Sequence, residues 1–321
     1  MSTIFDEFCR ETTAFINPTD CIKPLSEFPE ICITTFSQNI ITEFIENNNT
    51  KIIANLYSAN GILPVYEIKY DDASVGVFLS RVGAPACVVG LEEIIALGAK
   101  KIIQFGSCGT LNQSATENKI IIPTSAIRDE GTSYHYIEKG DEIAAEISSI
   151  NIATQCLEKH NIPYILGKIW TTDGIYRETL NLIKKRKEQG CLAVDMECSA
   201  SLAIAKFRNI PIIQFLFGAD NLDATEWEQR DLTDYGFQSA NKSIGFRIGY
   251  CIWKRGIQMI KSESYWLHCP TCRNKTRVKI RIDTELKNFP LFCPKCKQES
   301  LINVKKQQII VIEPDAKTQS R

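Results

Sequence analysis

Four cysteines near the end of the chain have the spacing of metal ligands. They form two Cys-Pro-x-Cys pairs separated by 20 residues: Cys269, Cys272, Cys293 and Cys296. A two-residue gap lets both thiolates of a pair point at one ion, and two such pairs complete a tetrahedral sulfur site. Zn²⁺ suits four thiolates. We therefore predict one structural zinc ion, with two disulfides as the alternative.

Polar residues at the ends of apolar runs form a second candidate site. Asp220 ends the nearly unbroken apolar run 210–221. Burial at the end of an apolar strand raises the pKa of a carboxyl group, as a general acid needs. The alternative is a helix cap, because Asp is common at that position. Ser107 lies in a Gly-Ser-Cys-Gly turn after the apolar run 101–106. On its own, this motif could be merely a tight turn.

The elements that position these residues alternate between β-type and helical patterns. Such alternation predicts an α/β fold with a mixed central sheet flanked by helices. Apolar runs suit strands covered on both faces. We expect strands over 30–36, 75–83, 101–106, 119–127, 164–172 and 210–221, helices over 37–48, 86–99 and 142–160, and a strand that turns into a helix over 191–208.

Composition limits the class of protein. The chain is 44% hydrophobic with a formal net charge of −1, so its global charge points to neither nucleic acid nor membrane. No apolar run approaches the roughly 20 residues of a membrane span. The acidic start of the chain lacks a secretory pattern, which favours a cytoplasmic, reducing location. We expect the nine cysteines scattered over 1–251 to be buried thiols.

The residue pattern changes near residue 262. We therefore place a domain boundary between 1–262 and 263–321. The second part has no long helical pattern, and 275–286 and 302–313 are predicted strands of a zinc-ribbon-like module. This part is also rich in basic residues, and aromatic residues occur near them in the sequence. Nucleic-acid contact is one interpretation, and a solvated charged face is the other, which nearby acidic residues favour. The basic residues are Arg273, Lys275, Arg277, Lys279 and Arg281, and the acidic ones are Asp283, Glu285, Glu299 and Glu313.

Three stretches of the first part, 79–112, 193–208 and 215–223, resemble the nucleoside phosphorylase superfamily, which includes purine nucleoside phosphorylases, uridine phosphorylases and nucleosidases. The segment 126–136 is similar to uridine phosphorylase. The C-terminal part resembles a family of short cysteine-rich proteins with a Lys-Thr-Arg motif, here at 275–277. The first resemblance implies cleavage of a nucleoside's N-glycosidic bond in a homo-oligomer whose active sites are completed across subunit interfaces.

The resemblance also implies roles for individual residues. Glu197 matches the glutamate that accepts hydrogen bonds from the 2′- and 3′-hydroxyls, and Met196 matches the residue that packs on the sugar. Asp220 matches the acid that protonates or hydrogen-bonds purine N7, which favours a purine nucleoside. Ser107 and Gly109 match the loop whose hydroxyl and backbone N–H groups hold the nucleophilic anion. The segment where the family builds its base pocket contains Trp170, Tyr176, Arg177 and Glu178.

Several positions depart from the family pattern at the phosphate site. The family's Gly-Asp-Pro-x-Arg loop is replaced by 35–39, an arginine is replaced by Gln104, and no arginine occurs between residues 40 and 75. A phosphate dianion normally draws two or three cations, and only Arg81 or Arg128 are candidates to compensate. We expect phosphorolysis with phosphate as co-substrate at a weakened site. The alternatives are a hydrolytic nucleosidase and a non-catalytic nucleoside or nucleotide sensor.

Overall fold

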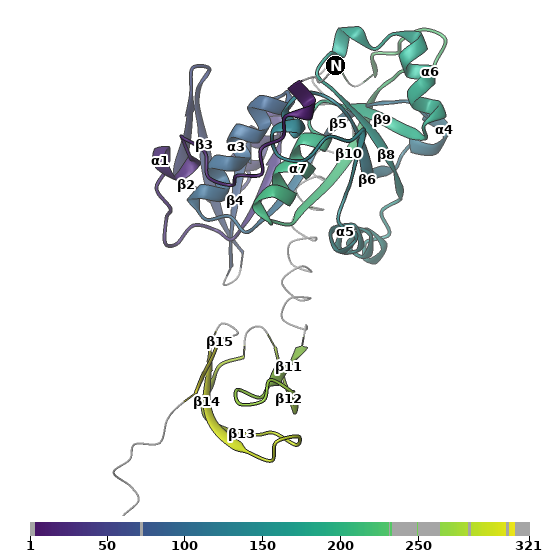
Figure 1. Ribbon diagram of the computed structural model, residues 1–321. Coiled ribbons are helices and arrows are strands. Elements are labelled where there is room, and N and C mark those ends of the chain that lie inside the picture. The colour runs from purple at the N-terminus through teal and green to yellow at the C-terminus, as the bar shows by residue number, and fades with distance from the viewer. Residues whose placement is uncertain are drawn as a thin grey trace, which may run out of the picture. The chain divides into compact units, whose positions relative to one another are not determined.

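A computed structural model describes residues 4–70, 73–230, 232, 249, 264–281, 284–305 and 308–311. The chain divides into two compact units, Met1–Trp253 and Lys254–Arg321, and Figure 1 shows both. The predicted boundary near residue 262 lies outside the described residues and stays a prediction. Among the described residues, no helix is long and apolar enough to cross a membrane.

The described part of the first unit is built on a ten-stranded sheet, and the predicted α/β class with a mixed sheet is confirmed. Its order is β10-β6-β8-β9-β5-β1-β4-β3-β2, with β7 added to β6. The strands are β1 (Ile31–Thr35), β2 (Thr50–Ser58), β3 (Gly61–Tyr70), β4 (Ala73–Leu79), β5 (Lys101–Thr110), β6 (Ile120–Asp129), β7 (Glu142–Ala144), β8 (Tyr164–Thr172), β9 (Cys191–Asp195) and β10 (Ile212–Asn221).

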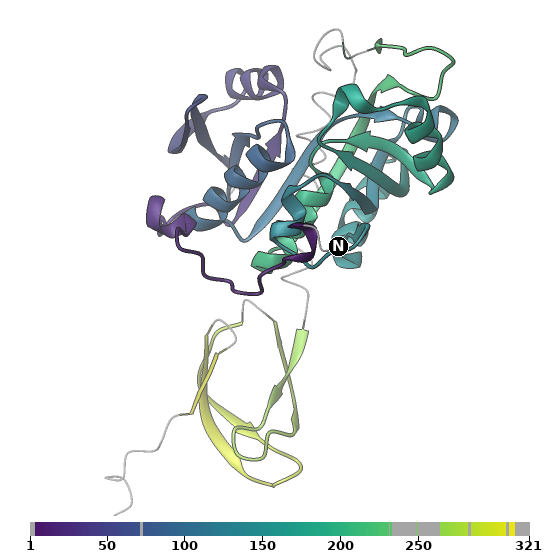
Figure 2. The same ribbon diagram turned by 45° about the horizontal axis from the view of Figure 1, so that its top comes forward.

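Part of this sheet closes on itself, because β5 pairs with both β9 and β10. The pairings β10–β6, β6–β8 and β8–β9 complete the ring. Strand β1 lies parallel to β5 and β4, and β2 and β3 extend this side as antiparallel strands. Figure 1 shows β2–β4 at one end of the sheet and β6, β8 and β9 at the other, and Figure 2 shows the same separation after rotation.

Helices cover the sheet and fill its core. Helices α3 and α7 pack on each other, α5 packs on β6 and β10, and α6 packs on β9. The helices are α1 (Pro18–Cys21), α2 (Gln38–Glu46), α3 (Ala84–Leu97), α4 (Gln113–Thr116), α5 (Ile147–Lys159), α6 (Leu180–Glu188) and α7 (Cys198–Arg208), with short 3-10 helices η1 (Ile4–Asp6), η2 (Thr132–His135) and η3 (Ile175–Arg177).

Two local expectations differ from the structure. The predicted helix 142–160 begins only at Ile147, because Glu142–Ala144 forms strand β7 and Ile143 pairs with Ala126 of β6. Not all of the scattered cysteines are buried: of the eight in described positions, Cys9 and Cys21 are exposed. Both belong to the N-terminal segment, which precedes the first strand of the sheet. Cys251 lies outside the described residues.

The second unit contains two small sheets. One pairs β11 (Ser264–His268) with β12 (Lys275–Arg281), and the other contains β13 (Leu286–Phe292), β14 (Glu299–Lys305) and β15 (Gln308–Val311). The predicted strand 302–313 is therefore divided between β14 and β15, which pair antiparallel. The buried apolar cluster of this unit is Leu267, Ile280, Leu291, Ile302 and Val304.

Candidate functional site

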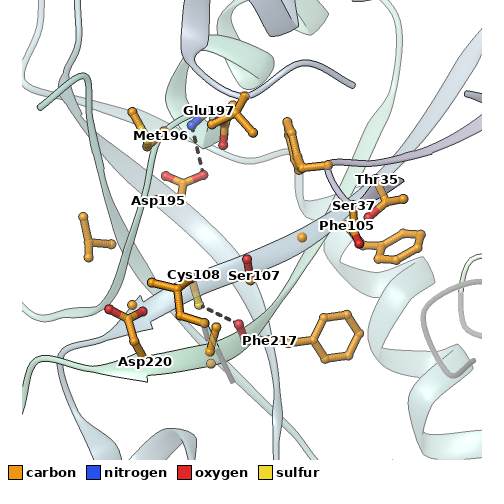
Figure 3. Close-up of a pocket in the computed structure, with 18 of the residues that line it drawn as sticks. Thr35, Ser37, Phe105, Ser107, Cys108, Asp195, Met196, Glu197, Phe217 and Asp220 are labelled. Carbon is orange, nitrogen blue, oxygen red and sulfur yellow. Dashed lines mark hydrogen bonds between the residues drawn. The ribbon is translucent and has the colours of Figure 1, made fainter. Parts of the chain in front are cut away.

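A cavity of about 600 Å³ opens at the ends of several strands of the first unit. Its lining comes from the ends of β1, β5, β9 and β10, the start of α2, and the segment around η3. Figure 3 shows Glu197 on one side, Asp220 on the other and Ser107 between them. The closed ring of strands thus brings together Ser107 and Asp220, which are 113 positions apart in the sequence.

Glu197 is held in the cavity wall by the turn from β9 into α7. Asp195 Oδ2 accepts hydrogen bonds from the backbone N–H groups of Glu197 (3.2 Å) and Cys198 (2.7 Å), so it pairs two backbone donors at the start of α7. The Thr171 hydroxyl donates to the other oxygen of Asp195 (2.7 Å). Glu197 Oε1 in turn accepts the backbone N–H of Gly83 (2.5 Å). Both carboxyl groups are therefore fixed before any ligand arrives.

Burial raises the pKa of both carboxyl groups in this turn. Three hydrogen bonds favour the ionised form of Asp195, whereas the charge of Asp195 adds to the effect of burial on Glu197. Asp195 therefore loses its proton first, and Glu197 holds its proton to higher pH.

Asp220 is directed into the cavity by a β-bulge. The register between β10 and β5 shifts between Gly218 and Asp220, and such bulges re-aim side chains. Burial raises the pKa of Asp220, although the indole N–H of Trp227 donates to its Oδ2 (2.8 Å). A Cβ at Gly109 would lie 3.2 Å from Asp220 Oδ1 and 2.5 Å from the side chain of Leu222, so a larger residue here would displace Leu222 and crowd Asp220.

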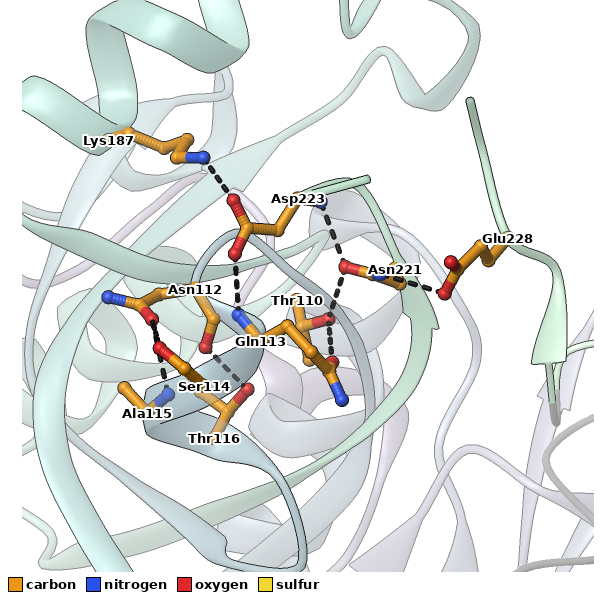
Figure 4. A network of polar contacts seen from close by, with 10 residues as sticks. All are labelled: Thr110, Asn112, Gln113, Ser114, Ala115, Thr116, Lys187, Asn221, Asp223 and Glu228. Atoms are coloured by element: carbon orange, nitrogen blue, oxygen red, sulfur yellow. Dashed lines mark hydrogen bonds and ion pairs between the residues drawn. The ribbon is translucent and has the colours of Figure 1, made fainter. Parts of the chain in front are cut away.

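A polar network behind Asp220 holds the end of β10 (Figure 4). The Thr110 hydroxyl donates to the backbone oxygen of Asp220 (2.9 Å), and Asp223 accepts the backbone N–H of Gln113 (2.9 Å) and pairs with Lys187. The Asn221 amide donates to Glu228 (2.8 Å), which closes the loop that carries Trp227. These contacts hold the backbone at the end of β10, next to the Asp220 side chain.

The base-pocket segment contributes differently from the prediction. Trp170 is fully buried and donates to Asp129 (2.9 Å), and Tyr176 is 96% exposed. Neither lines the cavity, and neither does the exposed Arg177. Glu178, the fourth residue named for this segment, does line the cavity, as does Ile175. Burial raises the pKa of Glu178 to about 7, with a further contribution from the charge of Asp220.

Of the other predicted residues, Met196, Ser107 and Gly109 line the cavity, together with the uncharged segment Thr35–Ile40. Ser107 is the one exposed residue of β5, so its hydroxyl is accessible. Phe217 in β10 also lines the cavity. Its residue type and its position within an apolar run gave no indication of this. The anion-binding role of Ser107 and Gly109 stays a prediction.

Gln104, Arg81 and Arg128, the side chains considered for the phosphate site, do not line the cavity. Gln104 is buried and hydrogen-bonded to Cys87 and to Gln214 of β10 (2.6 Å). Arg81 does not line the cavity, and its charge acts on Glu93 instead. Arg128 donates to Ser133 (2.8 Å) and to backbone oxygens of the 137–140 segment. Within the described residues, the lining includes four carboxyl groups and no Lys, Arg or His.

The second unit brings its four cysteines together. The ligand sulfur atoms of Cys269, Cys272, Cys293 and Cys296 lie within 4.8 Å of one another. Both pairs have the same turn: Arg273 N–H donates to Cys269 O and Lys297 N–H to Cys293 O (both 2.9 Å), and Arg273 and Lys297 have positive φ. Two matched turns with convergent thiols fit a single tetrahedral metal ion.

The fold and the cavity define a nucleoside phosphorylase-type α/β protein, and comparison with known proteins agrees. Residues 30–243 match the Phosphorylase superfamily, and the chain belongs to that family. Residues 264–316 match a second family, described as Cysteine-rich KTR. Both resemblances found in the sequence are thereby confirmed.

Individual relatives are distant. A DeoD-type purine nucleoside phosphorylase of Brevibacillus brevis is 29% identical over 138 residues, which are 42% of this chain and 59% of the relative. The chain thus spans about three fifths of that relative. Uridine phosphorylase from Vibrio fischeri superposes with a TM-score of 0.62 at 19% identity, covering 74% of this chain and 98% of that one. AMP nucleosidase from Bacteroides thetaiotaomicron gives 0.59 at 17%, covering 73% and 91%. These two likenesses show the fold.

Proposed function

We propose that this chain cleaves the N-glycosidic bond of a purine nucleoside in the cavity of the first unit. The observation that carries the proposal is the placement of Glu197 and Asp220 on two sides of one cavity, each with a pKa raised by burial. Departure of the base leaves an oxocarbenium-like sugar, so the base needs a proton and the sugar hydroxyls need acceptors. The two carboxyl groups supply these functions.

In this proposal Asp220 is the general acid. The C1′–N9 bond breaks, its electron pair moves to the base, and the Asp220 proton moves to N7. Raised pKa values keep Asp220 and its neighbour Glu178 protonated closer to neutral pH, as proton donation requires. Purines offer an N7 acceptor that pyrimidines lack, which supports a purine substrate. Glu197 accepts hydrogen bonds from the sugar hydroxyls, and Met196 packs on the sugar.

The acceptor of the sugar is either phosphate or water. The names of the phosphorylase relatives favour phosphate. One observation favours water as a second candidate: the described lining is rich in carboxyl groups, and the Thr35–Ile40 segment carries no charge. A phosphate dianion normally draws two or three cations, and the described lining offers none.

Phosphate dependence separates these two reactions. We expect base release to continue in phosphate-free buffer, and added phosphate to raise the rate by less than about tenfold, because the described lining offers no cation to bind it. The measurement is chromatography of free base together with assay of the sugar product. A strict phosphate requirement with ribose 1-phosphate as product would establish phosphorolysis instead.

We propose that the metal held by the second unit is zinc, since four thiolates suit that ion. Cys293→Ser is expected to reduce zinc from about one ion per chain to a small fraction and to unfold this unit, because metal binding supplies much of the folding free energy of such modules. Elemental analysis after gel filtration gives the measurement. Cys9→Ser, at an exposed cysteine of the first unit, is the matched control. A metal-free second unit that stays folded would contradict the assignment.

The predicted homo-oligomer and the cytoplasmic location stay predictions. The sensor alternative keeps the cavity as a binding site without turnover. It would replace the enzymatic proposal if the chain binds purine nucleosides and releases no base with or without phosphate.

A further inference from the structure

The second unit carries a basic sheet face that the proposed reaction does not use. Residues 264–281 contain five basic residues and no Asp or Glu, although the whole chain has 37 basic and 38 acidic residues. Lys275, Arg277 and Lys279 alternate along β12 and are exposed, and the residues between them are buried or half-buried. Side chains at alternate positions of a strand share a face, so the three cations are neighbours.

An aromatic side chain lies among these cations. Trp266 of β11 pairs in register with Lys279, and directly opposite residues of an antiparallel pair share a face. The ammonium groups of Lys275 and Lys279 lie 4.5 Å and 4.8 Å from the centre of the indole ring. Trp266, Lys275, Arg277 and Lys279 together form what we call the basic face.

Of the four acidic residues that dilute the charge in the sequence, the two in described positions lie outside β11 and β12. Glu299 belongs to β14 of the other sheet, and Glu285 directly precedes β13. A further cation is added instead: Lys295, from the second cysteine turn, is exposed and donates to Asn274 Oδ1 (3.1 Å), next to Lys275. The second cysteine turn therefore adds a positive charge next to Lys275.

We propose that the basic face binds single-stranded nucleic acid. Cations at regular intervals neutralise successive phosphates and release counterions. An aromatic ring among them stacks with unpaired bases, and this combination is typical of surfaces that bind single strands. The bases of a duplex are already stacked and present no free ring face to Trp266. The proposal is independent of the reaction in the first unit.

The test is fluorescence anisotropy of the full chain with short labelled single-stranded DNA and RNA over a range of salt concentrations. The variant replaces Lys275, Arg277 and Lys279 with alanine. We expect it to lose at least about tenfold in affinity at low salt, and the slope of log affinity against log salt to fall by about two to three, one for each lost phosphate contact. Trp266→Ala is expected to lose about fivefold or more without a change in that slope.

A control variant with alanine at Lys51, Lys184 and Lys185 removes the same charge from exposed positions of the first unit and should bind as the parent does. Zinc content and circular dichroism establish that each variant is folded, and base release reports separately on the first unit. Three results would overturn the proposal: a parent that binds neither single strand, equal affinity for the triple variant and the parent, or preferential binding of duplex DNA or of phosphatidylserine vesicles.

Discussion

Asp220→Asn is expected to lower the rate of purine base release by about 10²- to 10⁴-fold, the usual contribution of a positioned general acid. Asparagine has nearly the same shape and can still accept the hydrogen bond from Trp227, so the cavity should keep its form. The substitution removes only the proton that stabilises the leaving base. Steady-state rates with adenosine, inosine and guanosine give the measurement.

Two comparisons make this prediction specific. Asp141→Asn changes the same residue type at an exposed position of the first unit that does not line the cavity, and should leave the rate within about threefold. A purine nucleoside methylated at N7 already carries the positive charge that protonation would create. The loss in Asp220→Asn should therefore be at least about tenfold smaller with that substrate. An equal loss with both substrates would refute proton donation by Asp220.

Glu197→Gln is expected to reduce base release by about 10²- to 10³-fold while making the protein more stable at high pH. The lost activity follows from removal of the carboxylate that would hold the sugar hydroxyls as charge develops. The stability follows from the raised pKa of Glu197. A carboxyl group that holds its proton more tightly when folded stabilises the fold at low pH, and this contribution is lost as the pH rises through its folded pKa.

Glutamine does not titrate and can still accept the Gly83 N–H, so it avoids this loss. The difference in unfolding free energy between variant and parent should be small near about pH 5 and reach about 1–3 kcal/mol near about pH 9. Thermal unfolding at both pH values gives the measurement. The exposed Glu226→Gln is the matched control and should show no such trend. A variant that is less stable than the parent at high pH would contradict the assignment.

Sequence reasoning succeeded where apolar runs determine the elements. Strands β5, β9 and β10 follow apolar runs read from the sequence, and their ends form much of the cavity wall. The four cysteines were identifiable because their spacing alone prescribes two matched turns. The resemblance added Glu197 and Asp220, which the fold places on one cavity.

Other features depend on tertiary contacts that no local pattern encodes. An aromatic residue in a predicted pocket segment gives no sign of the direction its ring takes. Trp170 turns into the core to reach Asp129, and Tyr176 turns to solvent in η3. The β-bulge that aims Asp220 arises from the pairing of β10 with β5. Strand β7 forms because Ile143 adds to the edge of β6, which overrides its local helical pattern.

The most direct test of the proposed reaction is the release of free base from purine nucleosides by the purified full chain, measured beside Asp220→Asn prepared in the same way. Traces of host enzymes would contribute equally to both preparations, so the difference between them belongs to this cavity. We predict base release by the parent, at least about 10²-fold faster than by the variant. Equal release by the two proteins, or none from the parent with or without phosphate, would contradict cleavage at this site.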